Sequence, residues 1–274
     1  MNILHILNGE CTLQIFEQTG LEGGTIVWNE VLSEGPLEEN ISSGSFWRAR
    51  QKWITEIFNL PPEKYQEKTL NSLAGLTKPY GEINLWFEYD LHCQVNLLGV
   101  MNYLKLKGDL SLPSIYLICP ADFPGIEDFR GMGELEGRQL EYLFDNNRVQ
   151  LSEIDFAVAA GAWVNYVCND AEKLKHYIEN NKFWANLHCL KAALEAHLKR
   201  LRFNENGLNY IEQKLLNICN TGIANKTDIY AYIGKGCSSL IRIIKYNNSK
   251  NIEIRIFNIR KEFINNGLSV PILI

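Results

Sequence analysis

Two carboxylates, Glu88 and Asp90, stand one residue apart directly after the apolar run at residues 83–87. Two like charges at one strand end repel each other, so such a pair needs a proton or a cation between its members. A Mg²⁺ ion, a general acid–base pair or an arginine partner would each satisfy that need. Arg48 and Arg50 are the arginines available in the same part of the chain. We therefore predict a functional site at this pair, with Mg²⁺ as the candidate cofactor.

Polar residues also follow each of the other apolar runs that are typical of buried strands. In an open α/β sheet, ligands bind outside the carboxyl ends of the strands, so residues that follow parallel strands are expected at one edge. The residues expected to act in catalysis are Glu10, Glu30, Glu88 and Asp90. The residues expected to bind a ligand are Asn8, Gly9, Trp28, Glu34, Arg48, His92 and Gln94.

Each member of this set also has a purely structural explanation. Asp90 is placed to cap the helix that follows it, and Glu10 would favour the start of its own helix through the helix dipole. His92 falls in the first turn of a helix, where a solvated side chain is the simpler interpretation. His5, inside the first apolar run, is expected to be a hydrogen-bonded buried histidine rather than a ligand. The argument for a site therefore depends on convergence, because capping explains each residue singly.

The segment Phe46–Trp53 interleaves aromatic and basic side chains. Such a pattern can stack a base and hold a phosphate, but the spacing of its aromatic residues also fits a packing face. We expect the tryptophans to pack and Arg48 to face a phosphate. The sequence lacks the glycine-rich dinucleotide motif, the phosphate-binding loop, the nucleophile elbow and the zinc-protease motif. These absences argue against dinucleotide oxidoreductases, P-loop ATPases and common serine hydrolases.

Four short apolar runs must position these residues, and continuous runs of this kind are typical of strands buried on both faces. The runs lie at residues 2–7, 25–28, 83–87 and 115–118. Segments with helical periodicity separate them. This alternation predicts an α/β fold with an open, mostly parallel sheet flanked by helices, of the Rossmann or flavodoxin type.

Three segments of different composition follow one another along the 274 residues. We expect an α/β domain at residues 1–125, a helical region at 126–206 and a small winged-helix-like domain at 207–274. Residues 1–150 hold 11 Lys and Arg against 21 Asp and Glu, a net charge of −10, whereas residues 151–274 carry +5. Such an asymmetry suggests different roles for the two parts.

Three motifs span the ends of expected strands: HILNGE at residues 5–10, IVWNE at 26–30 and LWFEYD at 85–90. A fourth motif, SEGP at 33–36, lies in the loop after the second strand. They resemble the motifs of a bacterial family known as domain of unknown function eighteen-thirty-five, to which no activity is attached. The similarity continues through residues 131–135 and 207–212 and includes the family's usual C-terminal companion domain. Glu10 stands where the family has Asp, and Asn29 stands where it has Arg. The resemblance implies the composition of the site but no mechanism.

Seven widely spaced cysteines without a CxxC pair indicate a reduced protein rather than a disulfide framework or a zinc knuckle. No signal peptide and no spanning apolar run is recognisable, so we expect a cytoplasmic protein without membrane contact. The favoured function is a binding protein, or a hydrolase or transferase, for a phosphorylated or nucleotide-like small molecule. A regulatory module whose basic C-terminal part contacts nucleic acid is the less favoured alternative. The third possibility is a non-catalytic scaffold protein. The sequence leaves open whether the protein is an enzyme.

Overall fold

The computed structural model describes residues 2–107 and 113–221, in a chain that divides into two compact units. The first unit comprises residues 1–198 and the second begins at Lys199. Within the first unit, the segment after residue 125 adds an edge strand to the sheet, and the expected domain bounds at residues 125 and 206 stay a prediction. Most of the expected winged-helix-like domain, residues 207–274, lies outside the described residues.

The first unit is built on a five-stranded sheet with the order β2-β1-β3-β4-β5. Its strands are β1 (Ile3–Leu7), β2 (Gly24–Val27), β3 (Glu82–Trp86), β4 (Ser114–Ile118) and β5 (Val149–Gln150). The first four are parallel, and β5 pairs antiparallel with β4. The predicted open, mostly parallel α/β sheet is confirmed, whereas the sequence analysis missed β5, a two-residue edge strand with both residues exposed.

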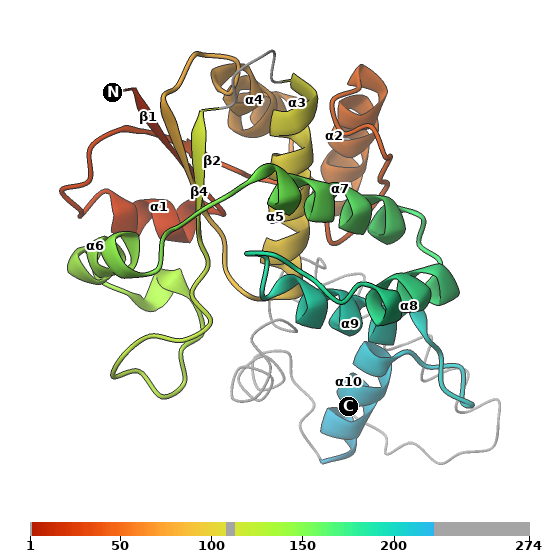
Figure 1. Cartoon of the computed structure of the whole chain (residues 1–274). Coiled ribbons are helices and arrows are strands. Elements are labelled where there is room, and N and C mark those ends of the chain that lie inside the picture. Colours follow the sequence, from red (N-terminus) through yellow and green to blue (C-terminus); the bar gives the residue numbers. More distant parts are fainter. Residues whose placement is uncertain (1, 108–112, 222–274) are drawn as a thin grey trace. The chain divides into compact units, whose positions relative to one another are not determined.

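Helices connect the strands and continue beyond the sheet (Figure 1). Before β4 they are α1 (Glu10–Phe16), α2 (Gly44–Phe58), α3 (Pro62–Tyr65), the π-helical turn η1 (Gln66–Leu70), α4 (Asn71–Gly75) and α5 (Leu91–Lys107). After β4 they are the 3₁₀ turn η2 (Met132–Glu134), α6 (Gly137–Asn146), α7 (Glu153–Val167), α8 (Ala171–Asn180), α9 (Leu190–Leu201) and α10 (Tyr210–Asn220). Helix α9 crosses the division between the two units, and α10 belongs to the second.

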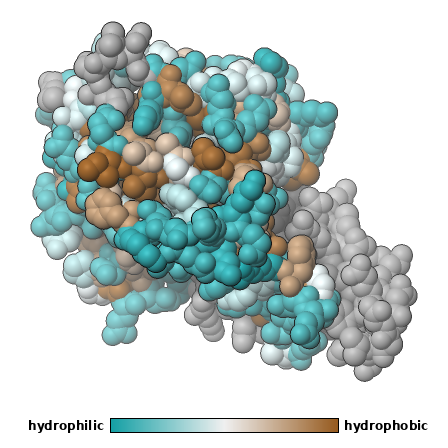
Figure 2. Space-filling model, turned by 45° about the vertical axis from the view of Figure 1, so that its right-hand side comes forward, coloured by the Kyte–Doolittle hydropathy of each residue, from teal (hydrophilic) through white to brown (hydrophobic). Residues whose placement is uncertain are grey.

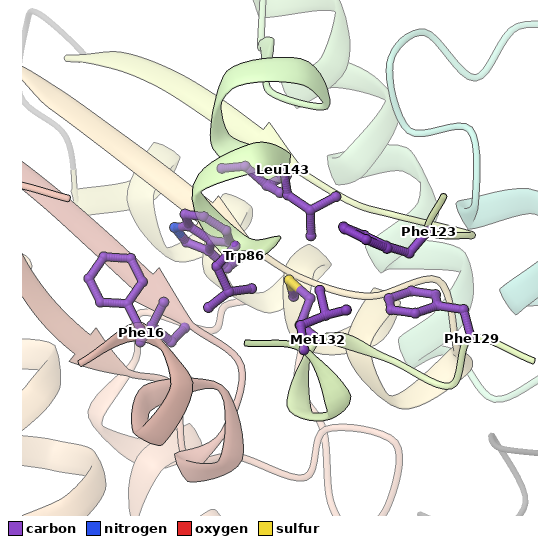
Figure 3. Close-up of a cluster of buried hydrophobic side chains, with 10 residues drawn as sticks. Phe16, Trp86, Phe123, Phe129, Met132 and Leu143 are labelled. Atoms are coloured by element: carbon purple, nitrogen blue, oxygen red, sulfur yellow. The ribbon is translucent and has the colours of Figure 1, made fainter. Parts of the chain in front are cut away.

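The two faces of the sheet are covered by different helices (Figure 1). Helices α1 and α6 contact each other on one face, and α5 packs with α7 on the opposite face. A cluster of buried side chains fills the space between the strands and the first pair of helices (Figure 3). Trp86 of β3 lies at its centre, beside Phe16 of α1 and Leu143 of α6, and Met132 and Phe129 close it from the loop after β4. This packing fixes the loop after β4 against the carboxyl end of β3.

Helix α5 is buried on every side from Leu91 to Leu104. A helix that is apolar all round is typical of the interior of a protein rather than of its surface. The few polar residues of α5 are therefore carried inward, and those of its first two turns lie next to the carboxyl end of β3. These include Cys93, Gln94 and Asn96.

On the face shown in Figure 2, hydrophobic residues form patches separated by hydrophilic residues. The large exposed hydrophobic side chains of the described residues come from many elements, including Leu106 of α5, Ile154 of α7 and Phe183 after α8. In the described part of the chain, no helix combines the length and the apolar composition that a membrane span requires.

Candidate functional site

The strand order places a topological switch point between β1 and β3. From β1 the chain moves outward to β2, then crosses back over β1 to form β3 and continues in the other direction to β4. The order 2-1-3-4-5 is that of flavodoxin-like sheets, in which ligands bind in the crevice beyond the carboxyl ends of the strands at the switch point. The residues that follow β1 and β3 flank this position.

Glu88, Asp90 and Cys93 converge at the switch point. One donor atom from each lies within 4.8 Å of the other two. The Cys93 Sγ is 3.2 Å from Glu88 Oε2 and 3.1 Å from Asp90 Oδ2, so the single thiol proton can serve either carboxylate. All three side chains are buried, with at most 6% exposure. The structure thus brings together the two carboxylates that the sequence analysis paired and adds a thiol that it did not consider.

Backbone and amide donors hold this group in place. Glu88 Oε1 accepts a hydrogen bond of 2.6 Å from the backbone N–H of Met132, whose side chain is anchored in the cluster of Figure 3. Asp90 Oδ1 accepts from the Cys93 backbone N–H at 3.1 Å, which makes Asp90 the cap of α5 as predicted. Asn8, the first residue after β1, donates from Nδ2 to the Cys93 Sγ at 2.9 Å. The remaining oxygens, Glu88 Oε2 and Asp90 Oδ2, both lie beside the thiol.

A buried amide network joins Asn8 to the loop after β2. Asn96 of α5 donates from Nδ2 to Asn8 Oδ1 at 2.9 Å and to the Glu30 carbonyl oxygen at 2.8 Å, and its Oδ1 accepts from the Leu32 N–H at 3.1 Å. His92 lies between Asn96 and the hydroxyl of Ser33, at 3.3 and 3.2 Å. His92 is therefore buried rather than solvated, and its contacts within the network position the loop.

Glu30 does not join the other predicted catalytic residues. Its carboxylate forms a fully buried ion pair with Arg50 at 2.7 Å, and it also accepts from the Tyr65 hydroxyl and from the Val31 N–H. Burial and the neighbouring Glu30 carboxylate raise the pKa of Tyr65 far above its ordinary value. The contacts of Glu30 thus stabilise the fold, and they do not support a catalytic role.

Arg50, and not Arg48, is the cation of α2 that the fold uses. Arg50 is fully buried and also donates to the carbonyl oxygens of Val31, Glu34 and Pro36. Arg48 points to the surface on the exposed side of the same helix, where its guanidinium lies near Gly44. Helical spacing from the buried Phe46 and Ile54 places Arg50 on the packing face, and that signal was available in the sequence.

The remaining predicted residues divide between the surface and the core. Glu10 is half exposed and contacts Lys68 Nζ at 3.1 Å and Asn29 Nδ2 at 3.3 Å. Trp28, predicted to bind a ligand, is instead buried against Trp47 and Tyr103 and packs in the core. These four contacts of Glu10 and Trp28 do not involve Glu88 or Asp90.

Gly9 and Gln94 do lie at the carboxyl ends of β1 and β3. Gly9 has a φ of 102°, and no heavy atom lies within 4 Å of the position that a Cβ would take there, so the space beside Asn8 is open. Gln94 donates to the Glu88 carbonyl oxygen at 2.8 Å and reaches the Cys119 Sγ at 3.4 Å. Gln94 therefore connects the carboxylate site to the end of β4.

A second group of potential metal ligands lies beyond Gln94. Cys119, directly after β4, meets His188 and Cys189, directly before α9, with one donor atom from each within 4.8 Å of the others. A hydrogen bond from Cys119 and the neighbouring His188 lower the pKa of the Cys189 thiol to about 5. The hydrogen bond to Cys189 raises the pKa of His188 to about 8. The wide separation of the two cysteines in the sequence gave no signal of this group.

Comparison with known proteins adds no assignment: no protein-family model matches the chain, and no curated protein matches it significantly.

Proposed function

We propose that the first compact unit binds a phosphorylated or nucleotide-like small molecule at the β1/β3 switch point, through a divalent cation held by Glu88 and Asp90. The observation that carries this proposal is the convergence of the two carboxylates, from the end of β3, with Asn8, from the end of β1. The proposal applies only to residues 1–198, in which all of these groups lie.

The donor chemistry favours a hard cation at the two carboxylates. Mg²⁺ is usually held by one or two carboxylates together with the phosphates of its substrate, and Mn²⁺ accepts the same oxygen ligands. Glu88 Oε2 and Asp90 Oδ2 supply such oxygens, whereas the neighbouring Cys93 is a soft donor that serves them as a hydrogen-bond partner. Positive charge at this position would attract a phosphate, a role for which Arg48 is unsuited because its side chain lies on the exposed side of α2.

Open space for the ligand is available beyond the end of β1. No heavy atom lies within 4 Å of the position that a Cβ of Gly9 would take, and Asn8 beside it is only half buried. Lys68 lies on the same side of the sheet edge through its ion pair with Glu10.

The alternatives differ in what the carboxylates do. As a general acid–base pair they would share a proton instead of a cation, and in a scaffold they would bind nothing. Nucleic-acid binding, the less favoured alternative, depends on the basic C-terminal part, which lies mostly outside the described residues. The resemblance to family eighteen-thirty-five supports the same site, because the motifs that carry it lie around the switch point.

The test is isothermal titration of the full chain with Mn²⁺ or Mg²⁺, alone and with a panel of nucleotides and sugar phosphates. We expect one cation site, at least about tenfold weaker in Glu88→Gln and Asp90→Asn, and tighter ligand binding when the cation is present. Glu88→Gln keeps the acceptor for Met132, and Glu56→Gln on the exposed side of α2 is the matched control. Equal cation affinity in all variants would refute the proposal. Turnover of a bound ligand would identify a hydrolase or transferase.

A further inference from the structure

We infer that Cys119, His188 and Cys189 form a zinc-binding site, separate from the carboxylate site at the switch point. The three residues come from two segments far apart in the sequence, the end of β4 and the turn before α9. The fold nevertheless places two sulfur donors and one imidazole nitrogen within 4.8 Å of one another.

The donor types and their separation fit Zn²⁺. Zinc takes thiolate and imidazole ligands at about 2.3 and 2.0–2.1 Å, so neighbouring donors of a tetrahedral site are about 3.3–3.8 Å apart. A group already within 4.8 Å needs only small side-chain movements to reach that geometry. Two cysteines and one histidine also leave a fourth position for water or another small ligand, as in zinc sites that are not purely structural.

The surroundings orient the donors toward a common point. The Nδ1 of His188 lies 3.2 Å from the Asn186 carbonyl oxygen, and donation of a proton there leaves Nε2 as the ligand atom. Such a bond from the second ring nitrogen is a regular feature of metal-binding histidines. The side-chain amide of Gln94 donates toward the Cys119 Sγ at 3.4 Å and fixes the position of that sulfur.

The start of α9 supplies further stabilisation of negative charge on sulfur. Cys189 directly precedes this helix of 12 residues, and its carbonyl oxygen accepts the first hydrogen bond of the helix, from the Ala193 N–H. Negative charge on a sulfur ligand at a helix N-terminus is stabilised by the helix dipole. The position of Cys189 before α9 therefore suits an anionic sulfur ligand.

A redox-active disulfide between Cys119 and Cys189 is the competing interpretation. It would use the two sulfurs but leave the third donor, His188, without a function in the reaction, and it would need an external oxidant. The exposed His188 also gives a metal ion from solvent access to the group. The presence of three convergent donors therefore favours zinc.

The experiment uses the full-length protein, stripped of metal with a chelator and kept reduced, and titrates it with Zn²⁺ against a chromophoric chelator. We expect one Zn²⁺ per chain, with an affinity that falls by about 100-fold or more in Cys189→Ser and His188→Asn. Replacement of Zn²⁺ by Co²⁺ is expected to give thiolate-to-cobalt charge transfer and the intense visible bands of tetrahedral Co²⁺, both lost in Cys189→Ser.

Three controls distinguish zinc binding at this site from binding elsewhere and from a loss of folding. Cys168→Ser removes an exposed cysteine and should leave Zn²⁺ binding unchanged, and Glu88→Gln should weaken Mn²⁺ but not Zn²⁺ binding. His188→Asn alters an exposed side chain, so folding, checked by circular dichroism, should be retained. Unchanged Zn²⁺ affinity in His188→Asn and Cys189→Ser would overturn the inference. A Cys119–Cys189 disulfide found by mass spectrometry in protein that binds no Zn²⁺ when reduced would overturn it in favour of redox chemistry.

Discussion

Substitution of Arg50 by methionine tests the conclusion that Glu30 and Arg50 hold the fold together rather than act on a ligand. Arg50→Met keeps most of the apolar stem but removes the guanidinium, which is fully buried and donates twice to Glu30 Oε2, at 2.7 and 3.1 Å. It also removes the donors to three backbone carbonyl oxygens, those of Val31, Glu34 and Pro36.

The structure sets the size of the expected effect. Removing one partner of a buried ion pair costs about 3–5 kcal/mol, because the other charge is left buried without compensation. Glu30 would keep its hydrogen bonds from Tyr65 and Val31, which reduces the cost, but the carbonyl oxygens that lose their donor increase it. We therefore expect a loss of about 4 kcal/mol, a large part of the 5–15 kcal/mol that is typical of folded domains.

Urea unfolding followed by tryptophan fluorescence measures this loss. At an m-value of about 3 kcal/mol/M, the midpoint should fall by roughly 1–2 M. Arg48→Met, on the exposed side of the same helix, is the matched control and should change the midpoint little. The double variant Glu30→Gln with Arg50→Met should recover part of the stability, because the uncompensated charge is gone. If Arg50→Met were as stable as Arg48→Met, the structural role of the pair would be refuted.

Three further predictions concern His5, Cys189 and Gly35. His5 accepts a hydrogen bond from the Trp86 indole at 3.1 Å, and burial lowers the pKa of His5. As the pH falls, the unfolded chain therefore takes up a proton before the folded protein does, and the stability that His5 provides should be lost below about pH 6.5. The measurement is the difference in unfolding free energy between wild type and His5→Gln, which should shrink as the pH falls. Because the pKa of Cys189 is about 5, its alkylation by iodoacetamide in metal-free protein should vary little between about pH 6 and 8. Gly35→Ala should lower the thermal midpoint, since φ is 81° and the new Cβ would lie 2.5 Å from the Trp53 ring.

Each of these three predictions has a result that would contradict it. A constant difference between wild type and His5→Gln from about pH 7.5 to 5 would show that His5 titrates normally in the folded protein. An alkylation rate of Cys189 that rises about tenfold per pH unit, as expected for a cysteine peptide, would show an ordinary thiol. A Gly35→Ala variant with an unchanged thermal midpoint would show that the loop beside Arg50 adapts without strain.

Local sequence patterns were sufficient to predict the sheet and part of the site. Strands β1, β3 and β4 are largely apolar and buried, and such strands need no long-range information to be recognised, whereas the edge strand β2 is exposed or half-buried along its length. Glu88 and Asp90 are close in space because they are close in sequence. The short edge strand β5 has no such pattern, since its two residues are exposed and its register depends on β4.

The other parts of the site depend on contacts between distant segments. Glu30 follows a strand like the other carboxylates, but its partners Arg50 and Tyr65 come from two later helices, and only their arrangement in space makes the pair structural. Cys119 and Cys189 are separated by a helix, an edge strand and two further helices. Nothing in their spacing indicates that the fold brings them together. The sequence therefore indicated Asn8, Glu88 and Asp90, whereas the strand order that defines the switch point, and the contacts of Cys93, follow only from the structure.

The central claim, a cation held by Glu88 and Asp90 at the switch point, is tested most directly by anomalous scattering from crystals soaked with Mn²⁺. We expect an anomalous peak between Glu88 Oε2 and Asp90 Oδ2, beside Cys93, that is absent from crystals of Glu88→Gln. Crystals without a peak at this position under saturating Mn²⁺, or with an equal peak in Glu88→Gln, would contradict it.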